Sequence, residues 1–243
     1  MKISFRHGWA MLSAAVLSLT ALPLSAVSSI TTISAAAAAA PVVENLDRGI
    51  VAIKSGNGIL VSWRFLASDQ TGTEFRLYRD DQLLMTSKGD EATCFYDESG
   101  SASARYRVDS LVNGTVQTTS TCSLISGTDY FQIPMDVPTA SDCTYSPNDC
   151  SVGDVDGDGV YELFVKWDPS NSKDNSQKGK TGNVYIDCYK LTGEKLWRID
   201  MGKNIRAGAH YTQFMVFDLD GDGKAEVVMK TSDGTKDGKG KII

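Results

Sequence analysis

The chain has 243 residues, a net charge of −6 at pH 7 and five cysteines. We exclude a nucleic-acid partner, because an acidic chain is repelled by a phosphate backbone. The odd number of cysteines leaves at least one thiol unpaired and excludes a disulfide-framework protein. A single bridge, Cys94 to Cys122 or Cys143 to Cys150, and free buried thiols both remain compatible with the sequence.

Residues 1–38 have the pattern of a secretory signal peptide. A basic start at Lys2 and Arg6 precedes an apolar stretch from residue 10 to residue 27, and a tract of small residues follows. A membrane anchor is the alternative, but Pro23 and the hydroxylated residues leave too little uninterrupted apolar length for one. We therefore expect a secreted, extracellular protein with no membrane attachment after cleavage.

Residues 41–135 predict a small β-sandwich. Short stretches of alternating apolar and polar residues are separated by turn signals such as Gly56-Asn57-Gly58 and Asn113-Gly114. Roughly seven strands with Trp63 near the second favour a fibronectin type III-like domain. We expect Trp63 in its core rather than on a sugar-binding surface. The strands are expected at residues 49–53, 59–63, 74–79, 82–84, 105–108 and 115–118.

Two copies of the motif Asp-x-Asp-Gly-Asp-Gly organise the rest of the chain. They begin at Asp154 and Asp218, and the match at this offset of 64 residues extends to Glu162 with Glu226. Alternating carboxylates on a glycine-containing backbone suit a hard cation, and calcium is the natural occupant. A solvated acidic turn without metal is the alternative.

The sequence after each motif distinguishes these loops from an EF-hand. The last carboxylate falls at loop position nine rather than twelve, and the residues that follow have strand character instead of helix character. Each loop therefore joins two strands and offers four carboxylates and one carbonyl to one ion. The predicted ligands are Asp154, Asp156, Asp158, the Val160 carbonyl and Glu162 in the first loop, and Asp218, Asp220, Asp222, the Lys224 carbonyl and Glu226 in the second. Asp233, Thr235 and Asp237 form a further candidate calcium site.

Residues 136–243 predict the start of a β-propeller. Hairpins that repeat at a fixed period are typical of propeller blades. The long polar loop at residues 168–182 accounts for the unusual length of the repeat, and a further hairpin follows at residues 184–199. A propeller cannot close with about one and a half blades, since its core is built by blade stacking. We therefore expect the chain to continue beyond Ile243.

Several longer stretches resemble the rhamnogalacturonan lyases of polysaccharide lyase family 11. They are Asn148-Asp149, the first acidic loop, the run Lys166 to Asn175, Leu196-Trp197-Arg198, the run Gly202 to Phe214 and the second acidic loop, with Leu46 to Gly49 and Leu60 to Arg64 nearer the start. The resemblance implies an all-β protein in which a β-sandwich precedes an eight-bladed, calcium-binding propeller. It also implies a secreted bacterial enzyme, expected as a monomer, whose partner is the pectic polysaccharide rhamnogalacturonan I.

The resemblance implies cleavage of the rhamnose–galacturonate backbone by β-elimination. The proton on C5 of a galacturonate becomes acidic enough to remove when the charge of the adjacent carboxylate is withdrawn by calcium, Arg or Lys. A base takes this proton, and the oxygen on C4 leaves. We assign no catalytic residue, because the family's proton-abstracting group is expected in later blades.

Residues outside the acidic loops are the candidates for sugar binding. Amide or carboxylate groups at strand ends suit sugar hydroxyls, and nearby cations suit uronates. The candidates are Asn148, Asp168, Asn183, Lys203, Asn204 and Arg206, with a solvated loop position as the alternative for each. His210 is expected as a hydrogen-bonded structural residue rather than a calcium ligand or catalytic group.

A second functional class also fits the acidic loops. Integrin-like blades share the Asp-x-Asp-x-Asp-Gly loop with a carboxylate at position nine, so a non-catalytic calcium-binding carbohydrate-binding or adhesion module is the alternative. The run Gly202 to Gln213 favours the lyase, because the lyase family carries this run and adhesion blades have no need for it.

Overall fold

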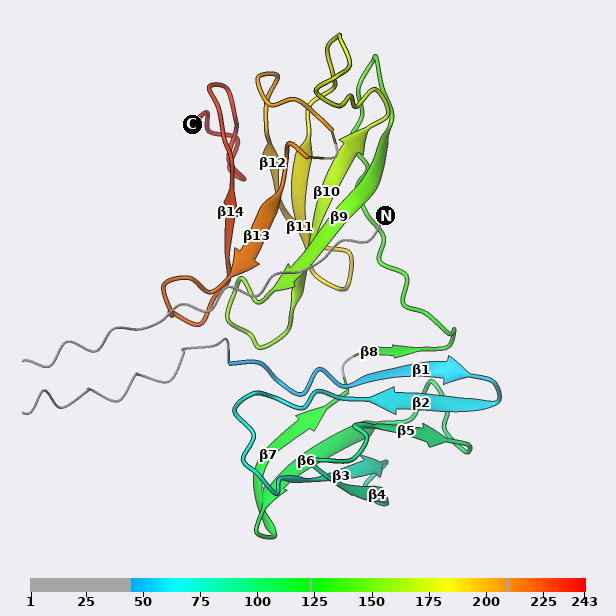
Figure 1. Ribbon diagram of the computed structural model, residues 1–243. Helices are drawn as coiled ribbons and strands as arrows, with labels where there is room; N and C mark the ends of the chain where they lie inside the picture. The colour runs from blue at the N-terminus through cyan, green and yellow to red at the C-terminus, as the bar shows by residue number, and fades with distance from the viewer. Residues whose placement is uncertain (1–44, 123, 209) are drawn as a thin grey trace, which may run out of the picture. The chain divides into compact units, whose positions relative to one another are not determined.

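The computed structural model describes residues 45–243 except residues 123 and 209, and every regular element in this range is a β-strand (Figure 1). The predicted all-β class is therefore confirmed. The predicted signal peptide lies outside the described residues. Within the described range there is no helix with the length and apolarity that crossing a membrane requires.

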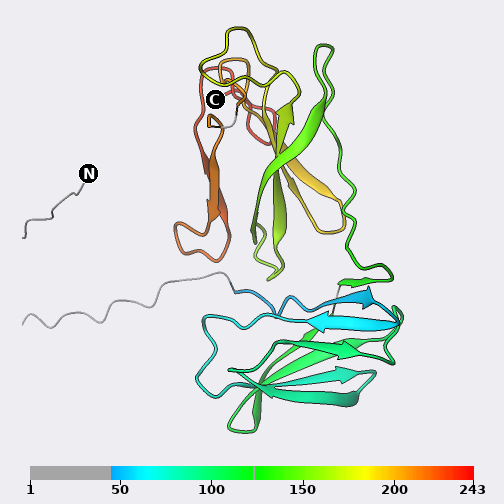
Figure 2. The same ribbon diagram turned by 45° about the vertical axis from the view of Figure 1, so that its right-hand side comes forward.

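The first eight strands form two four-stranded sheets. Their orders are β5-β2-β1-β8 and β4-β3-β6-β7, and all neighbours are antiparallel except β1 and β8. In Figure 2 the β1–β2 hairpin, coloured blue and cyan, lies above the teal strands of the second sheet. The strands are β1 (Val51–Ser55), β2 (Gly58–Ser62), β3 (Glu74–Arg79), β4 (Gln82–Lys88), β5 (Cys94–Asp97), β6 (Tyr106–Val112), β7 (Thr115–Thr121) and β8 (Leu124–Ser126).

One hydrophobic core joins these two sheets. Alternate residues of β3, Phe75 and Leu77, are fully buried and belong to the same cluster as Ala52 of β1 and Val61 of β2. This is the pattern expected when two sheets each bury one face against the other. Trp63 lies in the same cluster, so its predicted core position is confirmed.

The remaining strands form a four-stranded antiparallel sheet and a separate hairpin (Figure 1). The sheet follows the chain order, β12-β11-β10-β9, and the hairpin pairs Phe214 with Met229. The strands are β9 (Tyr145–Gly153), β10 (Glu162–Pro169), β11 (Tyr185–Tyr189), β12 (Lys195–Asp200), β13 (Phe214–Phe217) and β14 (Glu226–Met229).

A fully buried carboxylate, Asp187, cross-links three strands of this sheet. It accepts hydrogen bonds from the indole N–H of Trp167 at 2.8 Å, the hydroxyl of Tyr189 at 2.7 Å and the guanidinium of Arg198 at 2.7 Å. The charge is tolerated because donors surround it and Arg198 neutralises it. Burial and the hydrogen bond to Asp187 raise the pKa of Tyr189 to about 12, so this hydroxyl remains a donor at neutral pH.

Some strands were missed or predicted too short from the sequence. β5 and β8 were not predicted, and β9 begins at Tyr145 rather than near Cys150. These stretches are short or rich in exposed polar residues, so they lack the alternation that marks a half-buried strand. All five cysteines are free, but the expectation of buried thiols holds only for Cys188, because Cys94 and Cys150 are exposed.

We predict that Asp69→Asn strongly destabilises the N-terminal sheets. Arg48 donates to both Asp69 oxygens at 2.6 Å, and the two side chains are 4% and 6% exposed. Removing one partner of a buried pair costs about 3 to 5 kcal/mol, because the other charge stays buried and uncompensated. Urea unfolding measures this loss, and Asp81→Asn, an exposed carboxylate, is the control expected to stay within about 0.5 kcal/mol of the parent.

The Arg48–Asp69 pair also predicts how the stability of the fold depends on pH. Burial opposes ionisation of Asp69, but hydrogen bonds from Arg48 and the Leu66 N–H outweigh it and lower the pKa of this carboxyl. A pKa lowered by folding contributes stability above the unfolded value of about 3.9, and this contribution is lost as the pH falls through the folded value. The difference between parent and Asp69→Asn should therefore shrink below about pH 4. An unchanged difference would contradict this assignment.

Candidate functional site

The two acidic loops have the same hydrogen-bond pattern. In the loop between β9 and β10, Asp154 accepts the backbone N–H groups of Gly157 at 2.7 Å and Gly159 at 2.8 Å. In the β13–β14 loop, Asp218 accepts those of Gly221 at 2.7 Å and Gly223 at 3.0 Å. The sequence repeat is therefore a repeat of backbone conformation.

Glutamate at the end of each loop closes the same turn. Glu162 accepts the Val155 N–H at 2.9 Å, and Glu226 accepts the Leu219 N–H at 2.8 Å. The glycines of the first loop have φ of 81° at Gly157 and 87° at Gly159, values that side chains strongly disfavour. The motif therefore requires glycine at these positions so that the chain can wrap around the first aspartate.

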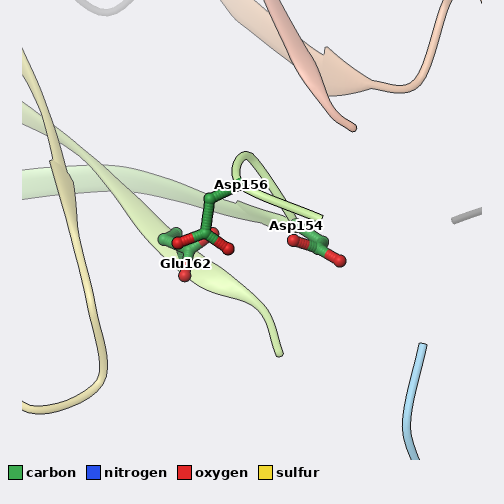
Figure 3. Close-up of side chains that lie close together, drawn as sticks. All are labelled: Asp154, Asp156 and Glu162. Atoms are coloured by element: carbon green, nitrogen blue, oxygen red, sulfur yellow. The ribbon is translucent and has the colours of Figure 1, made fainter. Parts of the chain in front are cut away.

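Three carboxylates converge in each loop. Oxygen atoms of Asp154, Asp156 and Glu162 lie within 4.8 Å of one another, as do those of Asp218, Asp220 and Glu226. In Figure 3 the side chains of Asp156 and Glu162 meet, and Asp154 lies beside them. Asp154 and Glu162 are each 1% exposed, so solvent does little to screen their mutual repulsion.

The third aspartate of each motif lies outside these groups. Asp158 accepts the N–H of Val160 at 2.8 Å, and Asp222 accepts that of Lys224 at 2.9 Å. Both side chains are thus engaged in shaping the turn. Coordination by these aspartates, and by the carbonyls of Val160 and Lys224, stays a prediction.

The electrostatics of the first loop favour a cation. Burial, together with the charges of Asp156 and Asp158, raises the pKa of Glu162. Lys190, in the turn between β11 and β12, lies 2.6 Å from Asp156 and 3.5 Å from Asp158. Oxygen-only donors of this kind fit a hard ion such as calcium.

The two loops also contact each other. The Ala225 N–H donates to the Asp154 carbonyl at 2.7 Å, and Gly157 faces the side chain of Lys224. The first loop therefore helps to fix the position of the second loop where it leads into β14.

Two of the sugar-binding candidates, Asp168 and Asn183, lie at the opposite end of the β9–β12 sheet. The register pairs Gly153 with Glu162 at the loop end and Tyr145 with Pro169 at the far end, where Asp168 faces Ser146. Asn183 precedes β11 at this far end and donates to Asp200 at 2.8 Å. The antiparallel strands thus separate the metal-type loops from the polar far end (Figure 1).

A β-bulge lies beside Asn148. The β9–β10 register shifts between Val165 and Trp167, which places Lys166 opposite this part of β9. The Lys166 side chain is 1% exposed, and its ammonium is paired with Asp149, whose N–H donates to the Asn148 side chain at 2.8 Å. The buried lysine therefore fixes the stretch of β9 that presents Asn148.

The other three sugar-binding candidates, Lys203, Asn204 and Arg206, have different surroundings. Arg206 donates to backbone carbonyls in the loop at residues 173–179, and Asn204 donates to the Asp233 carbonyl at 2.7 Å. Lys203 is exposed. Arg206 thus shapes a neighbouring loop, and the sugar contacts of all six candidates stay predictions.

The remaining candidates are less clearly arranged for a ligand. Thr235 is fully buried and donates to the Met201 carbonyl at 2.9 Å, while Asp237 accepts the N–H groups of Lys239 and Lys241. The Thr235 hydroxyl is thus bonded to a distant carbonyl and the Asp237 carboxylate to its own turn, and the third calcium site with Asp233 stays a prediction. His210 has a side chain that is 75% exposed, 3.9 Å from Asp174.

Sequence reasoning missed Lys190 and Asp149 as partners of the site. Lys190 lies 34 residues after Asp156, and its contact depends on strand pairing that a sequence pattern does not show. Lys166 did carry a signal, because it recurs as Lys230 in the repeat. Its buried pairing with Asp149 could not be inferred without the bulge.

Two family models match the chain. The model of the rhamnogalacturonan lyase family 11 C-terminal domain matches residues 130–243, and the model of the rhamnogalacturonan I lyase β-sheet domain matches residues 41–124.

Curated proteins show the same similarity. The chain is 57% identical over 211 residues to rhamnogalacturonan endolyase YesW of Bacillus subtilis (strain 168), covering 84% of this chain and 34% of YesW. It is 51% identical over 206 residues to rhamnogalacturonan exolyase YesX of the same organism, covering 82% of this chain and 34% of YesX.

Solved structures agree with these matches. The crystal structure of YesW superimposes with a TM-score of 0.75 at 57% identity, covering 83% of this chain and 35% of that chain. A rhamnogalacturonan lyase from Bacillus licheniformis gives a TM-score of 0.74 at 52% identity, covering 83% and 35%. The chain thus spans about a third of the length of the relatives it matches.

We predict that Arg206→Ala loosens the loop at residues 173–179. Its guanidinium holds carbonyls of Lys173, Asp174 and Gly179 at 2.9 to 3.1 Å, and alanine removes all of these bonds. Trypsin should then cut after Lys178 and Lys180 several-fold faster than in the parent, since cleavage needs local opening. The exposed neighbour variant Lys203→Ala should leave the rate unchanged. Equal rates in Arg206→Ala and the parent would show that the guanidinium does not hold the loop.

Proposed function

Because the chain belongs to rhamnogalacturonan lyase family 11, we propose that it is part of a secreted, calcium-dependent lyase that cleaves the rhamnose–galacturonate backbone of pectin by β-elimination. The observation that carries the proposal is the polar far end of the β9–β12 sheet. It holds Asp168 and Asn183 at strand ends away from the acidic loops, and Asn148 lies within β9 beside the bulge. Groups of this type suit the hydroxyls of a sugar chain.

The proposal includes the finer architecture. The two N-terminal sheets with one core are a fibronectin type III-like sandwich. The β9–β12 sheet, in which the strands pair in chain order, is one propeller blade, and the β13–β14 hairpin begins the next. Supporting this view, the acidic loop recurs at the same place in both hairpins.

Calcium has a structural role in this proposal. Asp154, Asp156 and Glu162 would hold one ion, and Asp218, Asp220 and Glu226 another. Bound calcium supplies positive charge that relieves the repulsion among buried carboxylates. The carboxylates themselves fix the backbone turn through their N–H contacts, which keeps β9 paired with β10.

The residues at the far end would bind and orient the polysaccharide. Asn148 and Asp168 offer an amide and a carboxylate to sugar hydroxyls, and the ion pair of buried Lys166 with exposed Asp149 holds this part of β9 in place. Orienting the galacturonate lets a base reach the C5 proton while the C4 oxygen leaves. We assign no base among the described residues.

We predict that the full natural polypeptide forms unsaturated uronate from rhamnogalacturonan I, and that Asp168→Ala lowers its kcat/KM by roughly tenfold or more, the effect of losing a charge-assisted hydrogen bond. Absorbance of the unsaturated product measures the rate. Asp142→Ala, an exposed carboxylate outside β9 and β10, is the control and should retain the parent rate. Pretreatment with a chelator should abolish the activity, and added calcium should restore it.

Two outcomes would contradict the proposal. If the polypeptide binds rhamnogalacturonan and calcium without forming product, it is a non-catalytic binding module. If product forms equally fast in excess chelator, calcium dependence fails while the lyase assignment stands.

A further inference from the structure

The loop between β10 and β11, residues 170–182, is organised around one guanidinium. Arg206 donates from Nε to the Lys173 carbonyl at 3.1 Å, from Nη1 to that of Gly179 at 2.9 Å and from Nη2 to that of Asp174 at 3.1 Å, and it also contacts the Gln177 carbonyl. A planar guanidinium that donates to several backbone carbonyls at once fixes the path of the backbone. The loop is therefore shaped rather than merely solvated.

Further contacts attach this loop to its neighbours. The Lys173 N–H donates to the Ala207 carbonyl, and the Ala207 N–H donates to the Thr181 hydroxyl, each at 3.0 Å. Gly208 approaches the loop so closely that an added Cβ would lie 2.7 Å from the Lys173 carbonyl oxygen. These contacts give the loop a defined position at the far end of the sheet.

The loop carries three lysines and one carboxylate, Asp174, so its net charge is positive. Lys178 and Lys180 are exposed, and in the described part of the chain neither has a carboxylate within ion-pair distance. The contacts of Arg206 are with neutral carbonyls, so its charge is not cancelled by an acid there. A cationic surface of this kind is unusual in a chain with a net charge of −6 and attracts an anionic ligand.

The loop continues directly from the strand end that holds Asp168. The Ser170 N–H donates to the Thr144 carbonyl at 2.8 Å, just beyond the last register pair of β9 and β10. Gly182, at the other end of the loop, donates to the Asn171 side chain at 2.7 Å and precedes Asn183. Both ends of the loop are thus attached beside the residues expected to bind sugar.

We propose that residues 170–182 form an additional subsite that binds a uronate carboxylate through Lys178 and Lys180, on a polysaccharide whose neighbouring sugars lie at Asn148 and Asp168. This inference rests on the proposed function and extends it, because it makes affinity depend on the number of galacturonates in the ligand. Arg206 acts here as a positioning residue that holds the backbone from which the lysines project. The contact is electrostatic and involves no chemical step.

The test compares Lys178→Gln/Lys180→Gln with the charge-matched control Lys54→Gln/Lys88→Gln, which removes two exposed lysines from the N-terminal sheets. The full natural polypeptide is titrated calorimetrically with a rhamnogalacturonan disaccharide and with a longer fragment carrying several galacturonates. Two exposed charge contacts predict roughly a three- to tenfold loss of affinity for the longer fragment. The loss should shrink at high salt and disappear with a carboxyl-reduced fragment.

Two further variants separate charge from folding. Lys178→Arg/Lys180→Arg should restore most of the affinity, because it keeps the charge. Arg206→Ala should weaken binding of the longer fragment as well, although it removes no lysine. Equal affinity of the parent and Lys178→Gln/Lys180→Gln for the longer fragment would overturn the subsite while leaving the proposed function intact. Failure of the parent to bind either fragment would overturn both.

Discussion

The convergence of carboxylates at the two acidic loops is the constraint on which the second half of the structure depends. Asp154 and Asp218 draw the backbone N–H groups of their own loops inward, which turns the chain sharply from one strand into the next. The same folding brings three carboxylates of each loop within 4.8 Å of one another, and Asp154, Glu162 and Asp218 among them are buried. A turn built this way is stable where a cation relieves the repulsion. The same carboxylates therefore determine both the backbone conformation of the loop and its affinity for a metal ion.

The antiparallel sheet then separates two tasks. One end of β9 and β10 carries the acidic loop, and the other carries Asp168 and the loop held by Arg206. Buried polar groups between these ends, Asp187 with Arg198 and Lys166 with Asp149, connect the strands. Each such pair stabilises only a specific register, because a slipped strand would leave a buried charge without its partner. Metal-type loops and the end proposed to bind sugar can thus coexist on one small sheet.

Much of this arrangement could be predicted from local sequence. Strand β3 was predicted with its observed bounds because Phe75 and Leu77 alternate with polar residues, and Asn113-Gly114 marked the turn between β6 and β7. The acidic motif predicted the groups that converge, since its spacing acts within a single turn. Asp158 and Asp222 were not brought together with them, because each engages the backbone N–H two residues later. Interactions that depend on pairing between distant strands, such as Lys190 with Asp156, have no local pattern and could not be predicted.

Calcium titration of the full chain by calorimetry tests the central claim most directly, with Glu162→Gln and Glu226→Gln as the comparison. Glutamine keeps the oxygen that accepts the Val155 or Leu219 N–H but removes the charge. Our account predicts that each substitution lowers the number of bound calcium ions by one and that the double variant loses both. Calcium binding that is absent from the parent chain, or that is unchanged in the double variant, would contradict it.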